Sequence, residues 1–189
     1  MVIMLKPLKN KDEIKNAQTT FENVLESIVN KKIRVKIGYK GGNVEADISY
    51  SEKYNFWFYL SDIVEGGSGK KRYWNVFGMG RPNERSNVSI TVEINSPLKG
   101  IYRKVAGVFA KDDKGNIFLL HRGIIGGGRK GIGKRIFYEY YDGDKVLLQE
   151  DKEPIALIGC ITDPDFPKKL KKFIEKVNEI KNLVSLQQK

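Results

Sequence analysis

The spacing of hydrophobic residues predicts a helix near the start of the chain and strands after it. Over residues 12–30, apolar side chains recur every three or four positions, which is typical of an amphipathic helix. From Lys32 to Leu60 the period changes to two, as in half-buried strands, with a turn signal at 40–43. Residues 54–60 are dense in aromatic side chains on both faces, so we expect this strand to be central in the sheet or covered on its second face.

The second half of the chain carries more strands and two further helices. The pattern predicts strands at 72–78, 88–95, 105–111, 116–120, 145–149 and 155–162, a short helix at 132–141 and a last helix from 163–167 to about Leu183. Strands come in runs and do not alternate with helices. The expected fold is therefore α+β, with a mostly antiparallel, strongly curved or barrel-like sheet flanked by N-terminal, short middle and C-terminal helices.

Composition adds a bias in charge to an otherwise ordinary globular chain. The 189 residues are 40% hydrophobic and 30% charged, which fits a single domain over residues 1–189 or the N-terminal module of a larger protein. The formal net charge is +11, and residues 99–135 hold ten lysines and arginines against only Asp112 and Asp113. Such clustering indicates a polyanionic partner, and the alternative is a lysine-rich solvated surface.

Cysteine and histidine usage argues against a metal centre, and we expect no cofactor. The single Cys160 excludes an internal disulfide and a multi-cysteine metal site, and its apolar surroundings in 155–161 predict a buried, inert thiol. One histidine cannot form the histidine pairs of common nuclease metal sites. No apolar run is long enough to span a membrane and the N-terminus is too short for a signal peptide, so a cytoplasmic location is expected.

The richest candidate for chemistry is the stretch 121–135, His-Arg-Gly-Ile-Ile-Gly-Gly-Gly-Arg-Lys-Gly-Ile-Gly-Lys-Arg. Glycines let the backbone approach another molecule closely, and the fixed charges are all positive. The stretch fits two phosphate-binding patterns, but Arg135 stands where a Mg²⁺-binding Ser or Thr would be, and no βαβ array surrounds it. This argues against nucleotide hydrolysis and favours contacts to nucleic-acid phosphates.

The residues expected at such an interface fall into two groups. The basic group comprises Arg122, Arg129, Lys130, Lys134 and Arg135, helped by Lys99, Arg103 and Lys104. His121 could donate to a phosphate or base, or could be a structural histidine. Trp57, Trp74 and Tyr138 are candidates for stacking on a base, although each could instead belong to the core.

Several of these stretches resemble domains of modification-dependent restriction systems that accompany McrB-type GTPases or HNH nucleases. The resemblance lies in Trp74-Asn-Val-Phe-Gly, Val92-Glu-Ile-Asn-Ser-Pro, Val105-Ala-Gly-Val-Phe-Ala and 121–134, and covers roughly residues 74–140. It implies a DNA-targeting module that recognises a modified base by flipping it out of the duplex. The chain lacks the GTPase motif and the HNH histidines, so a motor or nuclease would belong to another subunit or domain.

The sequence thus favours a non-enzymatic DNA-binding module, with duplex DNA as the preferred partner. No complete catalytic motif is present, so no catalytic residue is assigned. Three alternatives remain open: an RNA-binding domain, a metal-dependent nuclease, and a structural or protein-interaction domain with a lysine-rich surface.

Overall fold

The computed structural model describes residues 3–8, 10–39, 42–54, 56–61, 64–66, 72–74, 77–80, 107–121, 137–149 and 154–187. The chain divides into two compact units. Met1–Leu8 and Ala106–Lys189 form the first, which we call the barrel unit, and Lys9–Val105 form the second, which we call the inserted unit. The number of independent domains stays a prediction, and each unit is described by itself.

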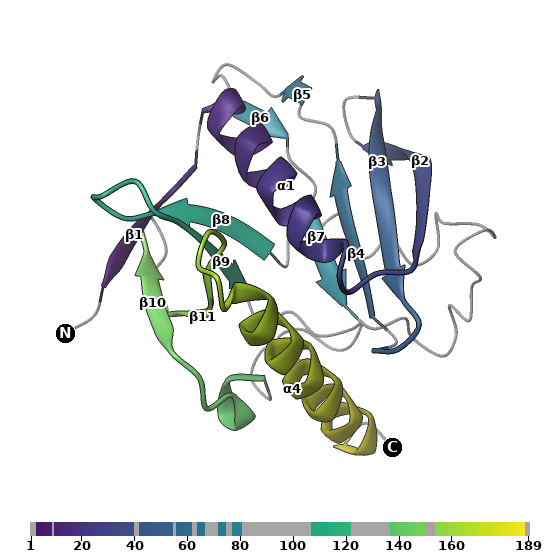
Figure 1. Cartoon of the computed structure of the whole chain (residues 1–189), viewed down its shortest axis with the longest axis vertical. Helices are drawn as coiled ribbons and strands as arrows, with labels where there is room; N and C mark the ends of the chain where they lie inside the picture. The colour runs from purple at the N-terminus through teal and green to yellow at the C-terminus, as the bar shows by residue number, and fades with distance from the viewer. Residues whose placement is uncertain are drawn as a thin grey trace. The chain divides into compact units, whose positions relative to one another are not determined.

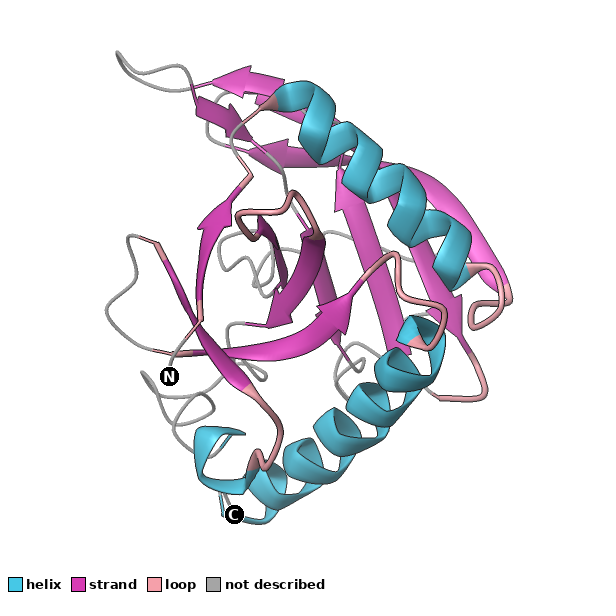
Figure 2. Ribbon diagram, turned by 60° about the vertical axis from the view of Figure 1, so that its left-hand side comes forward, coloured by secondary structure: helices cyan, strands magenta, loops and turns pink. Residues whose placement is uncertain are grey.

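The barrel unit is built around a closed five-stranded barrel. Its strands are β1 (Met4–Pro7), β8 (Gly107–Lys111), β9 (Ile117–His121), β10 (Lys145–Leu148) and β11 (Ile155–Cys160), in the spatial order β1-β10-β11-β9-β8. Figure 2 shows the strands in magenta and the helices in cyan. The β1–β10 pair is parallel and the other four pairs are antiparallel. The expectation of a mostly antiparallel, barrel-like sheet is confirmed.

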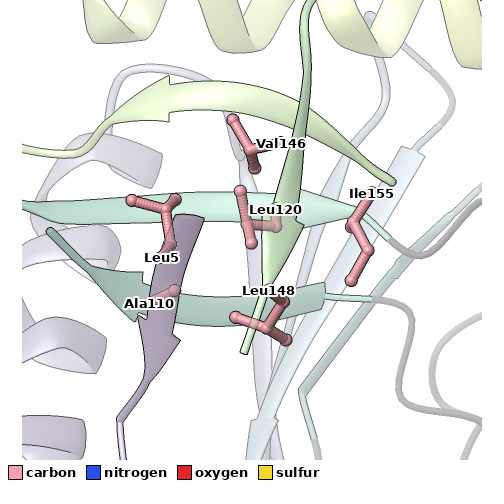
Figure 3. Packing of buried hydrophobic residues seen from close by; sticks show 6 residues of the cluster. All are labelled: Leu5, Ala110, Leu120, Val146, Leu148 and Ile155. Carbon is pink, nitrogen blue, oxygen red and sulfur yellow. The ribbon is translucent and has the colours of Figure 1, made fainter. Parts of the chain in front are cut away.

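Every strand of the barrel contributes to one apolar core. Figure 3 shows six buried side chains between the strands: Leu5, Ala110, Leu120, Val146, Leu148 and Ile155. Burying a side chain of leucine or isoleucine size stabilises a fold by about 1.5–3 kcal/mol. Because the six come from three separate parts of the chain, namely β1, the β8–β9 hairpin and the β10–β11 pair, this stabilisation is complete only once the barrel has closed.

The hairpin predicted around 112–115 is confirmed, and the Asp112 carboxylate stabilises its turn. β8 and β9 pair in register from Gly107 opposite His121 to Lys111 opposite Ile117. The Asp112 carboxylate accepts hydrogen bonds from the backbone N–H groups of Lys114 (3.0 Å) and Asn116 (2.9 Å). Gly115 has φ +85°, a conformation that glycine adopts without strain, so Asp112 and Gly115 together set the turn.

The C-terminal helix α4 (Phe166–Gln187) packs against β11 (Figure 1). Its buried stripe includes the predicted Leu170, Phe173, Ile174, Val177 and Ile180, joined by Phe166. The contact is close at Gly159, where an added Cβ would come within 3.2 Å of both Phe166 and Lys169. The predicted burial of Cys160 is confirmed, and its Sγ lies 3.2 Å from the Thr162 hydroxyl.

The inserted unit places a helix on a four-stranded antiparallel sheet. The strands β2 (Lys31–Tyr39), β3 (Gly42–Ser51), β4 (Phe56–Ser61) and β7 (Phe77–Gly80) lie in that order, and a separate hairpin joins β5 (Val64–Gly66) to β6 (Arg72–Trp74). The aromatic strand β4 is central, as predicted. The helix α1 (Lys11–Leu25) is capped by the Asn10 side chain and packs on β4 through Phe21, whose ring meets Phe58 at 5.8 Å.

The strand predicted over 72–78 is divided in two by its pairing partners. Residues 72–74 pair with β5, whereas residues 77–80 pair with β4. The sequence pattern is continuous there and does not reveal that the two parts pair with different strands. The strand predicted at 88–95 lies outside the described residues, and 137–140 is the described helical part of the short middle helix.

Among the described helices, none combines the length and apolar character that a membrane crossing requires.

The role of β1 in closing the barrel can be tested at Leu5. Leu5 is 1% exposed, whereas its neighbour Met4 is 60% exposed. We expect Leu5→Ala to lower the free energy of unfolding by about 2–5 kcal/mol, since it removes a side chain from the barrel core. Met4→Ala, the matched control in the same strand, should change stability by less than about 0.5 kcal/mol. Chemical denaturation would measure both, and equal effects would contradict this account of the core.

Candidate nucleic-acid interface

The structure describes the two ends of the predicted basic loop. The segment 122–136, with Arg122, Arg129, Lys130, Lys134 and Arg135, lies outside the described residues, as do Lys99, Arg103 and Lys104. On one side the description stops at His121, the last residue of β9. On the other side it resumes at Phe137, the first residue of the helical segment 137–140.

The two residues that flank this segment, His121 and Phe137, both contact a single ring on α4, that of Phe173. His121 lies 5.2 Å from Phe137 and 5.2 Å from Phe173, measured between ring centroids. Phe137 also contacts Phe173, at 6.4 Å, and stacks on Tyr141 at 5.0 Å with 16° between the planes. We call His121, Phe137, Tyr141 and Phe173 the aromatic cluster. It holds residues 121 and 137 side by side, so the intervening basic segment starts and ends at the same place on the barrel unit.

The aromatic cluster is assembled from three elements: β9 supplies His121, the short helix and the residue after it supply Phe137 and Tyr141, and α4 supplies Phe173. His121 is held in β9 between Gly107 of β8 and Ala156 of β11. Tyr141 follows the short helix, and its hydroxyl donates a 2.8 Å hydrogen bond to the backbone carbonyl of Leu157 in β11. Burial raises the pKa of Tyr141 to about 12, so the hydroxyl stays protonated and keeps this bond.

An ion pair adds a second link between α4 and the segment that follows the aromatic cluster. The Lys176 ammonium lies 3.7 Å from the Asp142 carboxylate, which is exposed. Such an exposed pair contributes little to stability by itself. Its position is informative because Asp142 directly follows Tyr141, so α4 and the end of the short helix meet through both aromatic and charged side chains.

His121 is a core residue, so it is corrected from a phosphate-contact candidate to a structural residue. Its side chain is 1% exposed, and burial lowers its pKa to about 3. Desolvation disfavours the imidazolium, so the ring is neutral at physiological pH and cannot supply a positive charge. Of the two roles left open by the sequence, the structural one fits this position.

The three stacking candidates lie in different surroundings. Tyr138 is half-buried, with its ring 5.2 Å from Phe137 and the Lys145 ammonium 5.5 Å from its centroid. Trp57 of β4 lies opposite Tyr50 of β3 and Gly80 of β7 in the sheet. Trp74 is the last residue of β6 and lies opposite Val64 of β5. Tyr138 is therefore the candidate that the structure brings next to the ends of the basic segment.

Tyr140 is the exposed tyrosine of this region. At 37% exposed it contrasts with Tyr141, which is 9% exposed and part of the aromatic cluster. The short helix explains the difference, because adjacent helical positions face different directions. The sequence shows three tyrosines close together, and only the packing on α4 separates the exposed one from the buried one.

Three basic residues of β2, namely Lys31, Lys32 and Arg34, form ion pairs with acids of the inserted unit. Arg34 of β2 bonds Asp47 (3.1 Å) and Glu45 (3.3 Å) of β3, and Lys31 pairs with Glu52. Opposite charges across neighbouring strands stabilise the pairing and neutralise each other. These residues therefore contribute less to an attraction for polyanions than their number suggests.

The barrel unit carries basic residues that the sequence-based site did not include. Lys168 and Lys172 of α4 are exposed and Lys171 is half-buried. In the part of the chain that the structure describes, no ion pair joins an acid to any of these three. The signal was present in the sequence as a run of lysines opposite the buried stripe, but such runs are common on solvated helix faces.

The described residues contain no group of three His, Cys, Asp or Glu side chains that could hold a metal ion. Comparisons with protein families, with curated proteins and with solved structures gave no match. The resemblance to restriction-system domains therefore stays a hypothesis.

The burial of His121 predicts a loss of stability in mild acid. Because its folded-state pKa is lowered from 6.5 to about 3, only the unfolded state takes up the proton as the pH falls below about 6.5. The stability present above that pH is therefore lost on acidification. We expect the wild type to lose about 2 kcal/mol more than His121→Phe between about pH 7 and pH 5.

Denaturant titrations across this pH range would measure the difference. His121 is the single histidine, so no other imidazole titrates in the window. Parallel stability curves for the wild type and His121→Phe would show that the imidazole is accessible, and would restore it as a candidate for contacting a ligand.

Proposed function

We propose that this protein is a DNA-binding recognition module that contacts the phosphates of duplex DNA through the basic segment 122–135. The proposal is supported by the aromatic cluster, in which His121, directly before this segment, and Phe137, just after it, both contact Phe173. The segment holds five of the ten basic residues concentrated in 99–135 and has no acidic residue. A polyanion is the partner that such a concentration of positive charge fits best.

The anchored ends favour binding for an entropic reason. A chain segment that becomes ordered on binding loses conformational freedom, and this loss opposes association. With residues 121 and 137 already fixed side by side, part of that loss has occurred on folding. The arginines can make two parallel hydrogen bonds to a phosphate, and the lysines act as point charges.

Recognition of a modified base is the finer part of the proposal. It rests on the resemblance to restriction-system domains, and a base flipped from the duplex requires an aromatic surface. Tyr138 is supported by its place directly after Phe137, and Trp57 and Trp74 remain candidates on the inserted unit. A cytoplasmic location and a partner nuclease or GTPase, as a subunit or domain, complete the proposal.

Neutralising the basic segment should weaken DNA binding and reduce its salt dependence. In Arg129→Gln, Lys130→Gln, Lys134→Gln we expect the slope of log affinity against log salt to fall by about 2–3, because each lost phosphate contact removes about 0.9. The charge-matched control is Lys11→Gln, Lys15→Gln, Lys114→Gln, at three exposed positions outside the segment. An unchanged affinity and slope in the first variant would contradict the proposed role of the segment.

A modified-base preference would appear in fluorescence anisotropy with labelled duplexes. The probes are one sequence without modification and the same sequence with methylated cytosine or methylated adenine, each across a salt series. We expect tighter binding to one modified duplex, by about tenfold or more, if a base is read directly. Equal affinities for all three duplexes would contradict this finer proposal.

Three further assays on the wild-type protein distinguish DNA binding from the alternative functions. Preferential competition by single-stranded RNA would favour an RNA-binding domain, since aromatic and basic surfaces also suit single strands. Cleavage of the duplex in the presence of Mg²⁺ or Mn²⁺ would identify a nuclease. Weak binding of every polyanion, lost near physiological salt, would indicate a structural or protein-interaction domain.

A further inference from the structure

α4 carries a group of three lysines that form no ion pair among the described residues. We call Lys168, Lys171 and Lys172 the α4 lysine face. Lys171 and Lys172 are adjacent, and they follow Lys168 by three and four residues. The three side chains therefore lie within about one helical turn of each other. The neighbouring Lys169 pairs with Asp165 (3.7 Å) and Lys176 with Asp142 and Glu179 (3.7 and 3.8 Å). Among the described residues, no acid forms an ion pair with the α4 lysine face.

The order of charges along α4 is opposite to the one that stabilises a helix. The first turn contains no acidic residue and the last turn contains no basic residue. Lys168 lies in the first turn, where the helix dipole disfavours an exposed positive charge by about 0.3–1 kcal/mol, and Lys171 and Lys172 follow in the second turn. Glu175 and Glu179 follow in the middle of the helix. Helix stability therefore does not account for the position of these lysines.

The α4 lysine face lies beside the place where the basic segment starts and ends. Phe173, which contacts both His121 and Phe137, directly follows Lys172. Figure 1 shows the short helix of residues 137–140 next to α4, as these ring contacts require. Lys169 and Lys176 are one turn from Phe173 on either side, so basic residues of α4 surround the junction.

We propose that the α4 lysine face binds the phosphate backbone of the same DNA duplex that the basic segment contacts. This inference rests on the proposed function and extends it, because it assigns a second, separate contact surface. The phosphate backbone is a continuous row of negative charges, and adjacent lysines can follow it without a fixed geometry. The three lysines contribute affinity and orientation, and base selection is left to other residues.

The test compares Lys168→Gln, Lys171→Gln, Lys172→Gln in the full chain with the wild type. We expect its affinity for an unmodified duplex to fall by about tenfold and the salt slope to fall by about 2. Thermal stability should stay the same or rise, since the change removes cations from the N-terminal half of α4. If these lysines served only to stabilise the fold, the variant would lose thermal stability and its salt slope of DNA binding would not change.

The controls separate failure of the inference from failure of the proposed function. The charge-matched variant at Lys11, Lys15 and Lys114 should bind nearly as the wild type does, which excludes an effect of net charge alone. If the α4 variant binds as tightly as the wild type while the variant of the basic segment loses binding, the inference is wrong and the proposed function stands. If the wild type shows no salt-dependent DNA binding, both are wrong.

An anionic membrane surface is the competing partner for an exposed lysine face. Vesicles with and without phosphatidylserine, mixed with the same four proteins, provide that comparison. Loss of vesicle binding in the α4 variant with unchanged DNA binding would overturn the inference. Loss of DNA binding with little vesicle binding by any of the proteins would support it.

Discussion

The barrel closes because a four-residue strand near the N-terminus, β1, pairs with two strands from the second half of the chain, β8 and β10. β1 lies between β8 and β10. The burial of Leu5 and the backbone hydrogen bonds of β1 both depend on that position. The backbone N–H of Gln149 donates to the Leu5 carbonyl at 2.7 Å, and that of Leu147 donates to Ile3 at 3.1 Å. Without β1, the facing edges of β8 and β10 would have no partner and the core would open to water. The inserted unit, residues 9–105, enters the chain between β1 and β8.

Closure of the barrel also determines the surroundings of the basic segment. β9 and β11 are neighbours in the barrel, so the end of β9 comes next to the helix that packs on β11. This places His121 against Phe173, and the short helix adds Phe137 and Tyr141 from the other side of the segment. A buried neutral histidine is suited to this position, because its flat ring packs with aromatic side chains without bringing a charge into the core.

The two units use their positive charges differently. In the inserted unit, Arg34 pairs with Asp47 of the neighbouring strand β3 and Lys31 pairs with Glu52, which directly follows β3, so these charges are neutralised by acids. In the barrel unit, the α4 lysine face has no ion-pair partner among the described residues and lies next to the start and end of the basic segment. A net charge of +11 does not distinguish these situations. Only the pairing of particular side chains shows where a polyanion would be attracted.

The sequence by itself determined the elements whose signal is local. The pattern of apolar residues located α1, the buried stripe of α4 and four of the five barrel strands, β8 to β11, and the Asp112–Gly115 turn located the hairpin, because short-range periodicity and turn chemistry decide these features. The fifth strand, β1, was not predicted, because four residues are too few to show a period. It also showed where the basic residues are concentrated. The tertiary structure decided which strands pair, and so divided the predicted strand 72–78 and closed the barrel through β1. It also made His121 a core residue and joined the ends of the basic segment at Phe173. These outcomes depend on contacts between residues far apart in the chain, and no local pattern contains them.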